Sequence, residues 1–278
     1  MKKILIILCI GLTCSLFAQQ QPPKGKLFII GGGSRPSGMV DRIIKESGID
    51  KSGYGIILPM SSIEPDSAVY YATRQFYDKG ITNVHGLNFV KGEISSPTKL
   101  DSISKAKLIY ISGGDQNRFM DVIAGTPIEK SIHKAYENGS LIAGTSAGAA
   151  VMSRMMITGN ELKHPEYSST FRYIQADNIE IKPGLGMLTN VIIDQHFVKR
   201  SRYNRLLSAV IQYPEMMGIG IDEATAILVD GNSVEVVGVS QVVVMENRGL
   251  STNKFEDKLG AHGMELNVFL PGDTFQID

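Results

Sequence analysis

The chain has 278 residues, of which 43% are hydrophobic and 20% charged, and its 28 basic residues equal its 28 acidic residues in number. A chain of this length can bury a sizeable apolar core, so the composition favours one globular domain that needs no disulfides to hold it together. The even charge balance, with no basic stripe along the chain, argues against nucleic acid as a partner.

Residues 1–18 have the pattern of a signal peptide. Two lysines precede an apolar run over residues 4–17, which is shorter than the ~20 apolar residues that a membrane-spanning helix needs. Its removal would leave a polar leader over residues 19–25 and 26 basic against 28 acidic residues. We therefore expect an exported protein, periplasmic or secreted, without a membrane span. Both cysteines, Cys9 and Cys14, lie in the removed segment, which excludes a cysteine nucleophile.

Residues 26–278 are expected to form a single α/β domain, because short apolar runs alternate with longer amphipathic stretches. This repetition indicates a parallel sheet with helices on both faces, a three-layer arrangement. The predicted strands are 27–30, 55–58, 108–111 and 141–145, and the predicted helices are 37–48, 67–79 and 127–138. Sites in such sheets form at the carboxyl ends of strands, so the loops after these strands are where chemistry is expected.

From about residue 218 the pattern changes to short apolar runs separated by turn residues. The runs are 226–229, 234–237, 242–245 and 266–270. Asp230-Gly231-Asn232 between the first two is a turn signal, so we expect C-terminal β-hairpins that extend the same domain.

The strongest chemical signal is Gly144-Thr145-Ser146-Ala147-Gly148, which follows a predicted strand and precedes the small residues of a helix start. This arrangement is typical of a nucleophile elbow, in which a sharp turn with strained backbone exposes a serine. The alternative is an ordinary glycine-rich turn. We expect Ser146 to be the nucleophile of a hydrolase.

Gly113-Gly114-Asp115-Gln116 follows the strand predicted at 108–111, at the same edge of the sheet. A tetrahedral intermediate needs two fixed N–H donors for its oxygen, and we expect those of Gly114 and Ala147 to supply them. An equally good interpretation of the motif is a turn in which Asp115 caps a helix over residues 117–124.

His196 is the leading candidate for the general base. Asp194-Gln195-His196-Phe197 ends an apolar run, and among the five histidines only this one follows the serine at the carboxyl end of a predicted strand. A buried structural histidine is the alternative.

Three arginines, Arg200, Arg202 and Arg205, follow this histidine closely. Arginines so spaced ordinarily form a solvated helix face. Beside a catalytic strand they are expected instead to bind a substrate carboxylate through bidentate hydrogen bonds, although helical spacing argues against all three reaching the same one.

Several carboxylates are candidates for the acid that orients the base. Glu223 is the first choice, since it ends the apolar run 218–221, and its neighbour Asp222 is a rival. The chain order common in α/β-hydrolases favours the interval between Ser146 and His196 instead. The acids in that interval are Glu161, Glu166, Asp177 and Glu180.

Four motifs in this order, at residues 113–116, 144–149, 194–197 with the arginines that follow, and 218–223, together resemble those of the cyanophycinases. The cyanophycinases belong to the serine peptidase family that includes the aspartyl dipeptidase peptidase E. The resemblance runs from Gly25 to the C-terminal Leu-Pro-Gly-Asp segment. It implies a fold like that of the class I glutamine amidotransferases, with serine in place of cysteine. It also implies hydrolysis of cyanophycin, a polyaspartate with arginine on its side-chain carboxyls, to β-Asp-Arg dipeptides.

Residue by residue, the resemblance places a triad at Ser146, His196 and Glu223. It also implies a substrate pocket formed by Gln116, Asp194, Gln195, Arg200, Arg202 and Arg205. The segment between Ser146 and Asp194 departs most from the family, with a polar insertion around residues 164–169.

Neither a metal nor another cofactor is expected, because no HExxH motif or cysteine pair is present. Gly31-Gly32-Gly33 lacks the downstream residues of a phosphate-binding loop. Two alternatives to a cyanophycinase remain open: a dipeptidase or isoaspartyl peptidase acting on small aspartyl peptides, and a non-catalytic ligand-binding protein on a hydrolase scaffold. The expected partner is a peptide with aspartyl linkages, and a homodimer is one of the assemblies that the sequence allows.

Overall fold

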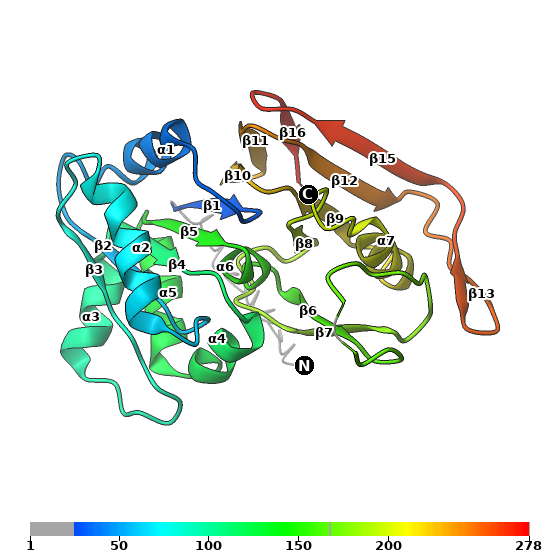
Figure 1. Cartoon of the computed structure of the whole chain (residues 1–278), viewed down its shortest axis with the longest axis horizontal. Coiled ribbons are helices and arrows are strands. Elements are labelled where there is room, and N and C mark those ends of the chain that lie inside the picture. The colour runs from blue at the N-terminus through cyan, green and yellow to red at the C-terminus, as the bar shows by residue number, and fades with distance from the viewer. Residues whose placement is uncertain (1–24, 167, 278) are drawn as a thin grey trace, which may run out of the picture.

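The structure is a computed structural model that describes residues 25–277 except residue 167. The predicted signal peptide over 1–18 and residues 19–24 of the predicted leader lie outside the described residues. Figure 1 shows a larger sheet with most of the helices around it and a smaller sheet beside it. None of the helices formed by the described residues is both long and apolar enough to cross a bilayer.

Five parallel strands make up most of the larger sheet. They are β1 (Lys26–Ile30), β2 (Gly55–Leu58), β3 (Val84–Gly86), β4 (Leu108–Ile111) and β5 (Leu141–Thr145), paired in the order β1-β5-β4-β2-β3. The four strands predicted in this region are confirmed. Every residue of β2, β4 and β5 is buried, because helices cover both faces of the sheet and both sides of each strand must be apolar.

The helices that connect these strands are α1 (Ser37–Ser47), α2 (Pro65–Tyr77), α3 (Pro97–Lys105), α4 (Gln116–Ile123) and α5 (Pro127–Glu137). The predicted helices at 37–48, 67–79 and 127–138 agree with α1, α2 and α5 to within two residues. Asp115 caps α4 by accepting a hydrogen bond from the Asn117 N–H at 2.8 Å, so the capping interpretation of that motif is confirmed.

The larger sheet is extended by antiparallel strands. The hairpin of β10 (Thr225–Asp230) and β11 (Ser233–Gly238) joins the sheet because β10 pairs with β1, and β16 (Thr274–Gln276) pairs with β11 at the edge. The turn between the hairpin strands contains Gly231 with φ 60°, as the turn signal there predicts. The sheet is therefore mixed, with its parallel part on one side.

The smaller sheet is a departure from what we expected. It consists of β8 (Val191–Gln195), β9 (Met217–Ile221), β12 (Val242–Asn247) and β15 (Met264–Phe269), in the order β15-β12-β9-β8, with α7 (Tyr203–Gln212) packed against it. Only β8 and β9 run parallel to each other. The strands before His196 and Glu223 thus end in a second sheet, and not at the edge of the sheet that carries Ser146.

Two small antiparallel pairs complete the fold. They are β6 (Met155–Glu161) with β7 (Ile179–Pro183), and β13 (Asn253–Phe255) with β14 (Lys258–Gly260). The chain passes from the smaller to the larger sheet between β9 and β10, next to the carboxyl end of β1. There Gly31 donates a backbone hydrogen bond to Thr225, and Ala224 donates one to Gly32.

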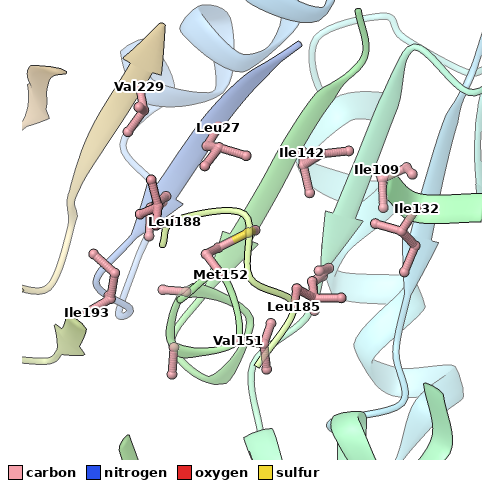
Figure 2. Close-up of a cluster of buried hydrophobic side chains, with 14 of the residues drawn as sticks. Leu27, Ile109, Ile132, Ile142, Val151, Met152, Leu185, Leu188, Ile193 and Val229 are labelled. Carbon is pink, nitrogen blue, oxygen red and sulfur yellow. The ribbon is translucent and has the colours of Figure 1, made fainter. Parts of the chain in front are cut away.

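One apolar core spans both sheets. In Figure 2, Met152 lies between Leu27 and Ile142 of the larger sheet and Ile193 of β8, and Val151 packs in the same cluster. Because these side chains are all at most 2% exposed, the relative position of the two sheets is fixed by packing directly behind the turn that carries Ser146.

Candidate active site

Ser146 lies in the tight turn between β5 and the short helix α6 (Ala147–Ala150). Its backbone has φ 54° and ψ −108°, a region that side-chain-bearing residues rarely adopt. The Ser146 N–H donates to the carbonyl of Ile30 on β1 at 3.0 Å, which holds the strained turn against the neighbouring strand. Strand, strained turn and helix follow one another here as in a nucleophile elbow.

The side chain of His196 reaches Ser146 from the smaller sheet. Its Nε2 lies 2.8 Å from Ser146 Oγ, and its backbone N–H donates to the carbonyl of Gly31 at 2.7 Å. His196 also has positive φ, 49°, directly after the last residue of β8. The backbone contact with Gly31 therefore ties the end of β8 to the end of β1 and places the imidazole over the serine.

Glu223 completes a chain of hydrogen bonds with these residues. Its Oε1 lies 2.6 Å from His196 Nδ1, on the side of the ring opposite Ser146. The next residue, Ala224, has φ 54° and donates to the carbonyl of Gly32, so the turn between β9 and β10 is fixed on both sides of the carboxylate. The structure thus brings together the three residues that we expected to form a triad.

The other acids considered for the orienting role bind elsewhere. Asp222 accepts from the Lys199 N–H at 2.8 Å and from Ser240 Oγ at 2.7 Å. The four acids considered between Ser146 and His196 make no hydrogen bond to His196 in the described part of the chain. Glu161 accepts from Asn178, Asp177 pairs with Lys254, and Glu180 accepts from Thr158 and Asn160. Glu166 is exposed. Of all the candidates, only Glu223 contacts the imidazole.

The glycine cluster after β1 is part of the site, a role that our sequence reasoning missed. A Cβ atom on Gly32, whose φ is 119°, would overlap the His196 ring, and one on Gly33 would lie 2.8 Å from Glu223 Cβ. The signal was present as three successive glycines at the end of a strand. It could not be interpreted without knowing that the histidine and the glutamate arrive from another sheet.

Two backbone segments beside Ser146 can supply an oxyanion hole. The N–H groups of Gly113, Gly114 and Ala147 make no hydrogen bond to other described residues. Gly113 lies beside the serine, since a Cβ on it would be 3.5 Å from Ser146 Cβ, whereas Gly114 packs against the carbonyl of Ser61. Gly113 therefore joins Gly114 and Ala147 as a candidate donor.

Most of the residues expected to form a substrate pocket are buried and bonded to one another. Arg205 makes a bidentate pair with Asp194, with Nε 2.8 Å from Oδ2 and a second contact to Oδ1. Arg202 donates from Nη1 to the backbone carbonyl of Gln195 at 2.7 Å and to its side-chain Oε1 at 2.5 Å. These two arginines connect α7 to β8 and do not lie on a solvated helix face.

The remaining two residues of that set differ from each other. Gln116 is buried, and its Nε2 donates to the carbonyls of Ile157 and Thr158 on β6 at 2.9 and 2.7 Å. Arg200 is half-buried, and its guanidinium makes no hydrogen bond or ion pair to the described residues. Arg200 is therefore the arginine of the three that is free to bind an anion.

The electrostatics of the site keep His196 neutral. Burial lowers the pKa of His196, the hydrogen bond that Nδ1–H donates to Glu223 raises it, and the positive charges of Arg200 and Arg202 lower it again, with a net downward shift. A neutral imidazole can accept a proton from the serine at neutral pH, which a charged one cannot.

A cleft of about 270 Å³ opens beside Ser146 and His196. Its other walls come from the loop after β1, from α2, from β4 and from the loop after β4. The polar residues Arg35, Tyr71 and Tyr110 line it, and none of them was singled out by the sequence. Among the described residues, no group of three or more histidine or acidic side chains is placed to hold a metal ion.

Comparisons with known proteins place the chain among serine peptidases. The model of peptidase family S51 matches residues 28–237. A cyanophycinase from Geminocystis herdmanii is 33% identical over 228 residues, which cover 79% of this chain and 80% of that protein. A cyanophycinase from a Nostoc species is 32% identical over 233 residues, covering 81% and 75%. A crystal structure of a peptidase from an acI-B1 Actinobacterium shares the fold, with a TM-score of 0.65 at 21% identity over 94% of this chain and 100% of that one.

Proposed function

The chain belongs to peptidase family S51 and is a serine-type peptidase, and from this premise we propose that it is an exported exopeptidase that hydrolyses cyanophycin to β-Asp-Arg dipeptides. The observation that carries the proposal is the unbroken chain of hydrogen bonds from Ser146 Oγ through the His196 ring to Glu223. This arrangement has the geometry that a nucleophile, a general base and an orienting acid require.

In the proposed mechanism, His196 Nε2 takes the Ser146 hydroxyl proton as Oγ attacks the carbonyl carbon of the scissile amide. The negative charge that develops on the carbonyl oxygen is stabilised by the N–H groups of Ala147 and of Gly113 or Gly114. The imidazolium then gives the proton to the leaving amine, and an acyl-enzyme remains. Water then attacks the ester as the same nitrogen takes its proton, and the imidazolium returns that proton to Ser146 Oγ as the acid is released.

Glu223 acts through His196 in this scheme. Its carboxylate accepts a hydrogen bond from the Nδ1–H group, which fixes the tautomer in which Nε2 is the basic nitrogen facing the serine. The same carboxylate stabilises the imidazolium that forms after proton transfer.

The choice of substrate rests on the named relatives and on the free arginine. Both relatives compared above are cyanophycinases that match about four-fifths of this chain. Arg200 supplies an unpaired guanidinium next to the base, suited to a substrate carboxylate, while Arg202 and Arg205 hold Gln195 and Asp194 in place behind it. The proposed export is supported by the signal peptide pattern of residues 1–18.

The direct test is to incubate the purified chain, residues 19–278, with cyanophycin and to identify the soluble products by mass spectrometry. Release of β-Asp-Arg that is abolished in Ser146→Ala is the expected result. Hydrolysis of short α- or β-aspartyl dipeptides with cyanophycin left intact would instead assign the chain a dipeptidase activity. If no aspartyl substrate is cleaved, the proposal is wrong.

A further inference from the structure

Arg35 occupies a wall of the cleft beside Ser146 and His196, in the loop between β1 and α1. Its Nε donates to Gln75 Oε1 at 2.9 Å and its Nη1 to the carbonyl of Gly33 at 3.1 Å. The Gln75 amide is fixed in turn by a hydrogen bond from its Nε2 to the carbonyl of Ala72 at 2.9 Å. The guanidinium is thus held in one orientation by α2 and by the glycine loop that contacts the base.

The charge of Arg35 is not neutralised by the protein. No carboxylate of the described residues forms an ion pair with it, and its partners Gln75 and Gly33 are both neutral. A half-buried, oriented guanidinium with no acidic partner, at the wall of a cleft, favours binding of an anion.

A second unsatisfied polar group lies in the same wall. Tyr110, at the centre of β4, is 1% exposed, and its hydroxyl makes no hydrogen bond among the described residues. The positive charge of Arg35 acts on this hydroxyl, and the side chains of Gln75 and Thr145 lie near it without the geometry of a hydrogen bond. Burial raises the pKa of Tyr110, so the hydroxyl stays protonated and can donate. Buried polar groups without partners are uncommon and call for an explanation.

The chemistry of the site indicates which part of a substrate enters this cleft. In the proposed function, on which this inference rests, His196 Nε2 returns its proton to the leaving amine, so that amine must lie within reach of Nε2. Nε2 faces Ser146, and both residues line this cleft, whereas Arg200 and Gln116 do not. The cleft is therefore on the leaving-group side of the scissile bond.

We infer that Arg35, with the Tyr110 hydroxyl beside it, forms a subsite that binds a carboxylate of the leaving group. In a cyanophycin fragment that carboxylate is either the α-carboxylate of the leaving aspartate or that of its attached arginine. A guanidinium and a protonated hydroxyl can each donate a hydrogen bond to a carboxylate oxygen. The subsite makes the enzyme selective for substrates with an anion on the departing side.

The test uses three synthetic two-unit cyanophycin fragments: the free acid, the amide of the leaving aspartate α-carboxylate, and the amide of the leaving arginine carboxylate. Wild-type kcat/KM should fall by about 10- to 100-fold for one of the two amides, the effect of losing a hydrogen bond to a charged group, and that amide identifies the carboxylate. Arg35→Gln should lower kcat/KM for the free acid by a similar factor. For the amide that identifies the carboxylate, kcat/KM of Arg35→Gln should be almost the same as that of the wild type. Tyr110→Phe should show a smaller loss of the same pattern, about 5-fold.

Arg74→Gln is the matched control, because Arg74 is an exposed arginine on α2, next to Gln75, that does not line the cleft. It should leave all three rates unchanged. Equal losses on the three fragments in Arg35→Gln, or none on any, would overturn the subsite.

Binding of the same fragments to Ser146→Ala, measured by calorimetry, separates this inference from the proposed function. If the wild type cleaves none of them, the proposed function fails. The subsite still stands if the inactive variant binds the free acid at least about 10-fold more tightly than one amide and Arg35→Gln removes that difference. Equal affinities for acid and amides, or no binding at all, refute it.

Discussion

The His196 imidazole lies among groups that shift its pKa in opposite directions, and the balance makes a prediction about pH. Burial and the positive charges of Arg200 and Arg202 outweigh the hydrogen bond that the ring donates to Glu223, so the pKa lies below its ordinary value of 6.5. If the neutral ring acts as the base, as proposed, kcat/KM should be constant at neutral pH and should fall only as the pH drops through this lowered pKa.

The matching measurement is a pH profile of kcat/KM for the wild type and for Arg200→Gln. Removing the positive charge of Arg200 should move the acidic midpoint upward, whatever it does to substrate affinity. A wild-type midpoint above 6.5, or a midpoint that moves down in the variant, would contradict the claim that burial and the arginine charges lower the pKa of His196.

Gly32 allows a second prediction at the scale of one residue. A methyl group at this position would overlap the His196 ring, and its φ of 119° is unfavourable for any other residue. Gly32→Ala should therefore displace the imidazole and lower kcat/KM by at least about 100-fold, since a misplacement of ~1 Å is enough for such a loss. Gly38→Ala is the control, because open space surrounds Gly38 in α1. Full activity in Gly32→Ala would mean that the loop contact does not position the base.

At the scale of elements, the buried arginines hold α7 against β8. The Arg205–Asp194 pair is almost inaccessible to solvent, with side chains 7% and 0% exposed. Arg205→Lys keeps the charge but loses the bidentate fork, so we expect the free energy of unfolding to fall by about 1–3 kcal/mol in denaturant titrations.

Arg200→Lys is the matched substitution at a half-buried position on the same segment. It should leave stability unchanged. On a substrate with a free carboxylate it should lower kcat/KM by a factor that corresponds to a loss of about 1–3 kcal/mol of transition-state stabilisation. If Arg205→Lys affected only kcat/KM and Arg200→Lys only stability, the assignments of the two residues would have to be exchanged.

Elements covered by helices on both faces were predictable from the sequence, and their grouping into sheets was not. The runs at 108–111 and 141–145 are continuous and apolar, as buried parallel strands must be. The runs that end before His196 and Glu223 have the same character, yet they belong to the smaller sheet. A continuous apolar run in the sequence indicates that a strand is buried, but which strands are neighbours depends on pairing between residues far apart in the chain.

The candidate site shows the same division. Ser146 and His196 were identifiable because each follows a strand, but the choice among six acids depended on which carboxylate the fold brings to Nδ1. The roles of Gly32 and Arg35 were invisible for a similar reason, since both act through contacts with residues far away in the chain.

At the scale of the whole molecule, the site exists only where the two sheets meet. The larger sheet supplies Ser146, the smaller sheet supplies His196, and the link between them supplies Glu223. The apolar core behind the serine spans both sheets, and Figure 1 shows them side by side. The proposed function therefore depends on the packing of the two sheets, because separating the sheets would separate Ser146 from His196.

The most direct test of this account is the site of reaction with a serine-reactive fluorophosphonate, mapped by peptide mass spectrometry alongside the loss of cyanophycin hydrolysis. The phosphonyl group is predicted on Ser146, with modification and inactivation proceeding at the same rate. In His196→Ala both the labelling and the hydrolysis should be lost while the fold is retained, because the serine no longer has a base. Labelling at another residue, or normal hydrolysis in Ser146→Ala, would contradict the assignment of Ser146 and His196 as nucleophile and base.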